Sequence, residues 1–114
     1  MKVSEIVQLL DGVVLSEGDN MEKDLHSACA SDMMSDVLAF VKDQAVLITG
    51  LCNPQVVRTA EMMDMLCIVL VRGKKPDTTL VELAKDRGIT LIATPHRMFA
   101  ACGILYQAGL KAEV

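Results

Sequence analysis

The chain has 114 residues, a length typical of one domain rather than two. Lysine and arginine together number 11 against 15 aspartate and glutamate residues, so the formal net charge is −4 and the pI is near 5.0. This balance argues against a nucleic-acid-binding surface, because such domains are usually strongly basic. The sequence therefore predicts a single domain over residues 1–114 that binds no nucleic acid.

The composition is apolar for so small a chain. Hydrophobic residues make up 52% of it, charged residues make up 23%, and the mean hydropathy is +0.38. Such a composition is typical of a globular domain and not of a disordered one. The surplus of apolar residues has two explanations, a well-filled core or a buried contact between subunits. We expect a homo-oligomer, with a dimer favoured.

Location and redox state follow from the apolar runs and the cysteines. No apolar run approaches the roughly 20 residues of a membrane-spanning helix, and residues 1–5 lack the pattern of a secretion signal. We expect no membrane contact and a cytoplasmic location. The cysteines lie beside apolar residues, without the short spacing of a zinc or redox pair, and are interpreted as reduced thiols. They are Cys29, Cys52, Cys67 and Cys102.

The N-terminal part predicts two helices with two strands between them. Ser4 is a candidate cap for a first helix that ends at Asp11-Gly12. Residues 12–15 and, more weakly, 25–30 are predicted strands. Ser31-Asp32 is typical of a helix cap. After it, apolar residues recur at helical spacing, namely Met34, Val37, Leu38 and Val41.

Three short apolar runs then alternate with helices. Residues 45–49, 66–71 and 90–93 are predicted strands, and the second is apolar on both faces, as in a central strand. Alternation of this kind implies parallel strands joined by helical crossovers. The sequence therefore predicts an α/β fold: a single-domain, three-layer arrangement with a mainly parallel sheet of four to five strands and crossover helices.

Local signals set the starts of the later helices. Asn53 is a cap, and Pro54 takes the first helical position, where a missing N–H leaves no hydrogen bond unmade. The next helix opens at Pro76-Asp77 and runs to about residue 87, followed by Gly88. The last helix is predicted to open at Thr94-Pro95 and to run to about residue 108.

Ligands of an open parallel sheet bind beyond the carboxyl ends of its strands. The loops 49–53, 71–75 and 93–97 meet there, and each leads to a helix whose first N–H groups favour an anion. Arg72, Lys74 and Lys75 add positive charge, but a solvated basic turn also explains these three residues. The candidate ligand-binding residues are Gly50, Asn53, Arg58, Arg72, Lys74, Thr94 and His96.

The sequence contains no recognisable catalytic constellation. Neither His26 nor His96 has an acid, serine or cysteine fixed beside it by spacing, and two histidines alone make a poor metal site. The glycines do not cluster as they do in a Walker A loop or a dinucleotide-binding fingerprint. We expect a protein that is not an enzyme and that uses no metal or cofactor.

Four segments of the chain resemble the DRTGG-domain family. The longest, residues 47–62, reads LITGLCNPQVVRTAEM, and the others are residues 68–76, 31–40 and 98–106. Together they extend over nearly the whole chain. The five letters that give the family its name do not occur as a block, although residues 57–60 are similar to part of them. The members of the family that the chain resembles include stand-alone DRTGG proteins of anaerobic bacteria.

The resemblance implies a regulatory role. DRTGG domains are similar to the N-terminal domain of HPr kinase/phosphorylase, whose kinase reaction belongs to a separate P-loop domain, so naming this chain a kinase would mislead. The sequence favours a non-catalytic regulatory and assembly module that self-associates and docks a redox or signalling partner, such as a hydrogenase component. The alternative is a sensor of a nucleotide or phosphorylated metabolite at the carboxyl ends of the strands.

Overall fold

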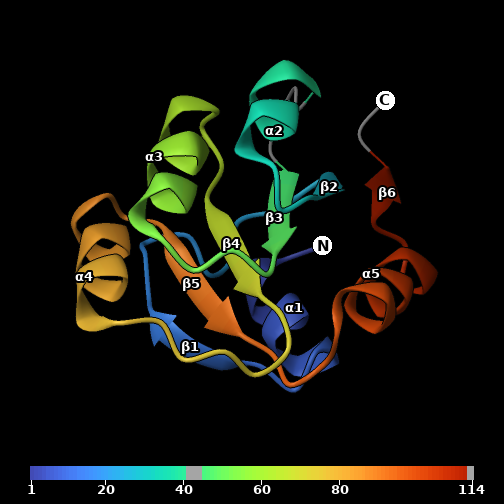
Figure 1. Cartoon of the computed structure of the whole chain (residues 1–114). Helices are drawn as coiled ribbons and strands as arrows, with labels where there is room; N and C mark the ends of the chain where they lie inside the picture. The colour runs from blue at the N-terminus through green and yellow to red at the C-terminus, as the bar shows by residue number, and fades with distance from the viewer. Residues whose placement is uncertain (41–44, 113–114) are drawn as a thin grey trace.

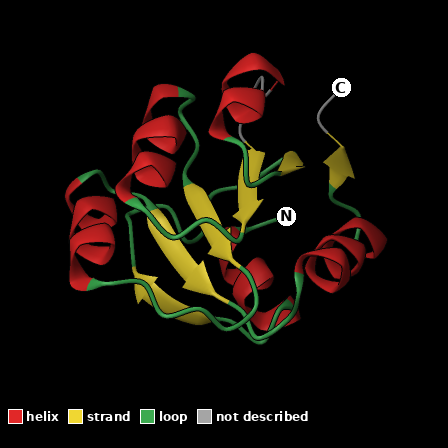
Figure 2. Ribbon diagram, in the orientation of Figure 1, coloured by secondary structure: helices red, strands yellow, loops and turns green. Residues whose placement is uncertain are grey.

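The computed structural model describes residues 1–40 and 45–112 as a central sheet with helices on both faces (Figures 1 and 2). Among these residues no helix is long and apolar enough to cross a membrane. The elements in chain order are α1 (Val3–Leu9), β1 (Val13–Ser16), β2 (Ser27–Ala30), α2 (Met34–Phe40), β3 (Ala45–Thr49), α3 (Pro54–Met62), β4 (Cys67–Leu70), α4 (Thr78–Asp86), β5 (Thr90–Ala93), α5 (Met98–Gln107) and β6 (Lys111–Ala112).

The sheet has six strands in the order β1-β5-β4-β3-β2-β6. All neighbouring pairs are parallel except β1 and β5, which run antiparallel with Val13 opposite Ala93. The predicted α/β class and mainly parallel sheet are confirmed. The sheet has one strand more than the predicted four to five, because Lys111 and Ala112 pair with β2. Two residues are too short a stretch for any periodic pattern to reveal.

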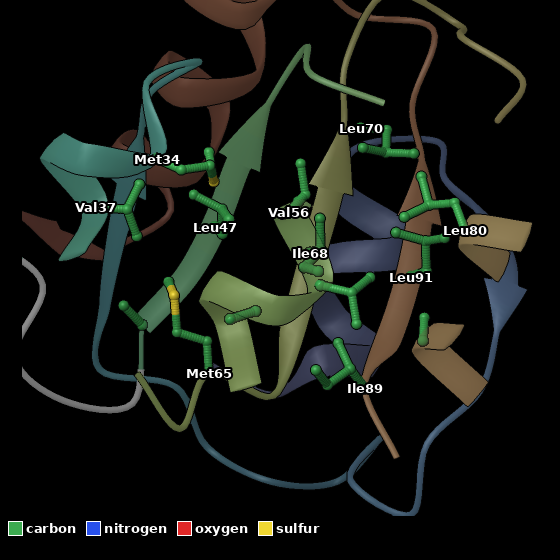
Figure 3. Close-up of a cluster of buried hydrophobic side chains, with 14 residues drawn as sticks. Met34, Val37, Leu47, Val56, Met65, Ile68, Leu70, Leu80, Ile89 and Leu91 are labelled. Atoms are coloured by element: carbon green, nitrogen blue, oxygen red, sulfur yellow. The ribbon is translucent and has the colours of Figure 1, made fainter. Parts of the chain in front are cut away.

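Two apolar cores lie on the two faces of the sheet. Every residue of β3 and β4 is buried, because helices cover these central strands on both sides. One core packs α2, α3 and α4 against the sheet through residues such as Val37, Val56, Ile68 and Leu80 (Figure 3). The other packs α1 and α5 against the opposite face through residues such as Ile6 and Leu105. The three layers are therefore two helical layers and the sheet between them.

Two predicted helix starts are confirmed, because each depends on neighbours in the chain. The Asn53 side chain accepts a hydrogen bond from the N–H of Gln55 at 3.0 Å, and Pro54 is the first residue of α3. The Asp77 carboxylate accepts one from the N–H of Leu80 at 3.1 Å at the start of α4. Side-chain capping of this kind satisfies N–H groups that have no partner within the helix.

Two other predicted helix starts are wrong. The cap of α1 is Lys2 rather than Ser4, and the Lys2 N–H donates to the Glu5 carboxylate at 3.0 Å. The last helix begins at Met98, after Arg97, and not at Thr94-Pro95. The Thr94 hydroxyl instead closes a short turn by accepting from the N–H of His96 at 3.2 Å. Val41, expected on the second helix, lies outside the described residues.

Candidate functional site

The loop after β4 lies between the ends of β3 and β5, because these parallel strands flank β4. It is bonded to the segment after β5: the N–H of Arg72 donates to the carbonyl of His96 at 2.7 Å, and that of Gly73 to the carbonyl of Thr94 at 2.8 Å. Arg72 has a left-handed backbone with φ of 67°, which is uncommon for a residue other than glycine. The hydrogen bonds of the Arg72 and Gly73 N–H groups to the segment after β5 hold this conformation.

Two basic side chains from this loop lie against Gly50, which follows β3. The Lys74 ammonium donates to the Gly50 carbonyl, and a Cβ at Gly50 would lie 2.8 Å from a guanidinium nitrogen of Arg72. The N–H of Gly50 donates at 2.7 Å to Asp32 Oδ1. We call these four residues, Asp32, Gly50, Arg72 and Lys74, the Gly50 cluster. It joins two cations and one carboxylate around a glycine.

Asp32 is a member of this cluster that the sequence did not reveal. It was expected to cap the second helix, but its carboxylate accepts from Gly50 N–H and, at 3.1 Å, from the Thr49 hydroxyl. The N–H of Met33 instead donates to the Ser31 hydroxyl at 3.0 Å. The parallel pairing of β2 with β3 brings Asp32 beside the end of β3.

The Cys52 thiol lies near the cluster but is not activated by it. Burial raises the pKa of this thiol above its ordinary value of 9.0, and the charge of Asp32 raises it further. Lys74 and Arg72 lower the pKa without reversing the shift. Because the thiolate is the reactive form of cysteine, Cys52 is a poor nucleophile at neutral pH.

An open pocket of about 530 Å³ lies next to the Gly50 cluster. We call it the rim pocket. Its walls come from β1, from the loop between β4 and α4, from α4 and from the end of β5. Lys74 belongs to both the cluster and the pocket, so the two are continuous. The other lining residues are Asp11, Val13, Leu15, Gly73, Lys75, Pro76, Val81, Ala93, Thr94 and Pro95.

The structure brings together three of the seven predicted site residues, Gly50, Arg72 and Lys74, in the Gly50 cluster. Thr94 lines the rim pocket, but its buried hydroxyl donates to the carbonyl of Leu10 at 2.7 Å. The Thr94 hydroxyl therefore has a structural role, and Thr94 does not begin a helix whose N–H groups could bind a ligand.

The other three predicted residues lie apart from the cluster. His96 Nε2 is 3.6 Å from a carboxylate oxygen of Asp11, at the edge of the rim pocket. The Asn53 side chain is occupied in capping α3. Arg58 is exposed on α3, and within the described residues no hydrogen bond or ion pair joins it to the cluster. Over the same residues, no group of three His, Cys, Asp or Glu side chains is placed to hold a metal ion.

These features define a small three-layer α/β domain with basic loops at the carboxyl ends of its parallel strands. The DRTGG domain model matches residues 5–108, and the chain belongs to the DRTGG domain family. The resemblance noted in the sequence is thereby confirmed. No curated protein matches the chain.

A solved structure shares this fold. It contains the CBS and DRTGG domains of the regulatory region of Clostridium perfringens pyrophosphatase, complexed with its activator, diadenosine tetraphosphate. The TM-score is 0.75 over 98% of this chain, with 19% sequence identity. This chain covers 48% of that chain, about half its length. At this identity the comparison establishes the fold alone.

Proposed function

We propose that this chain is a non-catalytic regulatory domain that senses a small anionic ligand, a nucleotide or another phosphorylated metabolite. The observation that carries the proposal is the position of the Arg72 and Lys74 side chains at Gly50, beside an apolar pocket of about 530 Å³. A pocket of this size takes a small organic ligand, and its apolar walls suit a ring. The two cations suit a phosphate at its edge.

The charge distribution supports an anion rather than a cation as the ligand. Lys75 lines the pocket beside Lys74, so three basic residues gather here in a chain of net charge −4. The carboxylate of Asp32 balances one of these three positive charges. An anionic ligand could take over the hydrogen bond that Lys74 now gives to the Gly50 carbonyl. Ligand binding would then break the hydrogen bond that joins the loop after β3 to the loop after β4, so both loops would respond to the ligand.

A regulatory role agrees with the domain family. The Clostridium perfringens relative is the regulatory region of a pyrophosphatase, described with a nucleotide activator. A non-catalytic role is also supported by the raised pKa of Cys52, which keeps the thiol nearest the cluster protonated. Docking of a redox or signalling partner and a cytoplasmic location stay predictions from the sequence.

The test is a thermal-shift screen of the purified chain with ATP, AMP, diadenosine tetraphosphate, inorganic phosphate and sulfate. A ligand at about 100 times its Kd adds roughly 2.7 kcal/mol to the free energy of unfolding. For a domain of this size the Tm then rises on the order of 10 °C. Arg72→Ala and Lys74→Ala should each raise the Kd of that ligand at least about tenfold, because each removes a charge-assisted hydrogen bond.

Lys85→Ala is the matched control, since Lys85 is an exposed cation in the last turn of α4. It should leave the Kd unchanged. Gly50→Ala is a second probe of the site, because the added Cβ displaces the tip of the Arg72 side chain rather than backbone. It should weaken binding while the chain still folds. A screen without any Tm shift, or equal affinities for Arg72→Ala and Lys85→Ala, would contradict the proposal.

A further inference from the structure

The outer face of α5 is apolar and uncovered in the single chain. Phe99 is 92% exposed and Tyr106 is 69% exposed, while Ala101 and Leu105 on the inner face are buried in the core. Residues 98–110 include no charged side chain. A helix that is apolar on all sides is typical of a helix buried on all sides.

Gly103 lies in the middle of α5, yet the fold of the single chain does not require a glycine there. Its φ is not in the left-handed region that favours glycine, and a Cβ added to it would meet no atom within 4 Å. Glycine inside a helix is destabilising relative to alanine, so its presence needs a reason. The missing side chain allows another backbone to approach the helix closely from outside.

We propose that a second copy of this chain covers this face, with the two α5 helices crossing at Gly103 about a two-fold axis. Phe99 precedes Gly103 by one turn, and Tyr106 follows it by nearly one turn. In an antiparallel crossing, Phe99 therefore meets the partner's Tyr106, and the reverse contact follows by symmetry. A surface that matches itself in this way suits a closed dimer.

The shape and size of the surface agree with a dimer. A shallow groove of about 460 Å³ lies over Gly103, lined by Phe99, Cys102, Tyr106 and Gln107 as well. Buried aromatic side chains remove about 150–250 Å² each from water, so four largely exposed rings supply roughly half of the ~1,200 Å² that a specific interface needs. Ala100, Gln107 and the surface beside them are available for the remainder.

Charge restricts the faces at which two copies can meet. Each chain has a net charge of −4, so two copies repel one another over most approaches. Residues 98–110 carry no charged side chain, so a contact between two α5 helices does not itself place like charges against one another. The interface does not involve the Gly50 cluster, so a ligand screen without a hit would leave this proposal standing.

The test is sedimentation equilibrium of the full chain. The wild-type chain should form a dimer, and Gly103→Leu should raise the dimer Kd at least about tenfold by filling the groove. The same variant should keep or raise the Tm at concentrations where the protein is monomeric, because leucine favours a helix and the space above Gly103 is open. Phe99→Glu should also abolish the dimer, by placing a charge in the contact.

Met62→Glu is the control, because Met62 is 70% exposed on α3 and lies outside the proposed interface. It should leave the dimer intact. A wild-type chain that stays monomeric up to its solubility limit would overturn the proposal, and so would a dimer that survives both α5 substitutions. Loss of the dimer in Met62→Glu would equally overturn it, because the contact would then lie on another face.

Discussion

Thr94 joins the N-terminal region of the chain to the end of β5. Its buried hydroxyl donates to the carbonyl of Leu10 at 2.7 Å and accepts from the N–H of His96 at 3.2 Å. Leu10 is the C-cap of α1, where carbonyl groups have no partner within the helix. A single hydroxyl therefore satisfies a helix end that is distant in sequence.

Thr94→Val tests this role at the scale of one residue. Valine keeps the shape of threonine but removes both hydrogen bonds, leaving the Leu10 carbonyl without its donor. We expect the free energy of unfolding to fall by about 1–3 kcal/mol, measured by urea denaturation. Thr79→Val, at an exposed position of α4, should change it by less than about 0.5 kcal/mol. Equal midpoints for the two variants would show that the hydroxyl has no structural role.

At the scale of elements, Asn20 fastens the long connection between β1 and β2 to the amino ends of two other strands. Its side-chain amide donates to the carbonyls of Leu66 and Gly88, both at 3.0 Å. Its carbonyl oxygen accepts from the Thr90 hydroxyl at 2.5 Å. These bonds connect one segment to the starts of β4 and β5, so the connection does not depend on apolar packing alone.

Asn20→Asp should therefore destabilise the fold strongly, although the two side chains are nearly the same size. The new carboxylate cannot donate to the carbonyls of Leu66 and Gly88, and it places a buried negative charge against their oxygens. We expect a loss of about 3 kcal/mol in the free energy of unfolding, measured by urea denaturation.

The same substitution at Asn53 is the matched control. Asn53→Asp preserves the oxygen that caps α3, and aspartate is as good a cap as asparagine, so stability should change by less than about 0.5 kcal/mol. Similar losses at the two positions would contradict the structural role assigned to Asn20.

For the whole molecule, one buried thiol makes stability depend on alkaline pH. Cys67 lies in β4 within the second core, and burial raises the pKa of its thiol from 9.0 to about 12. In the unfolded chain the thiol loses its proton at a lower pH than in the folded protein. The stabilising contribution is thus fully present below pH 9 and is lost progressively between about pH 9 and pH 12.

We expect the free energy of unfolding to fall by up to about 1.4 kcal/mol per pH unit above pH 9 on account of this group. Urea denaturation at pH 7.5, about 9 and about 10 measures the slope. Cys67→Ala should be less stable at neutral pH because it leaves a small cavity, but should lose less stability on going alkaline. Parallel losses in the two proteins would assign the effect to other groups.

The sequence by itself determined those parts of the fold that depend on neighbours in the chain. Continuous apolar runs predicted the buried strands β3, β4 and β5, and Asn53-Pro54 and Asp77 predicted the starts of α3 and α4. These signals are local, because capping and strand burial are expressed within a few residues. The same reasoning predicted that Gly50, Arg72 and Lys74 lie close together, since loops after parallel strands meet at one edge of the sheet.

Only the tertiary structure decided the contacts between distant segments. Ala30 pairs with Ile48, and this register places Asp32 at Gly50, which no spacing in the sequence indicates. Thr94 has the sequence of a helix start, but the nearby Leu10 carbonyl engages its hydroxyl. A side chain that can cap its own helix can equally bond a remote group. Which of the two it does depends on what the strand order and helix packing bring within hydrogen-bonding distance.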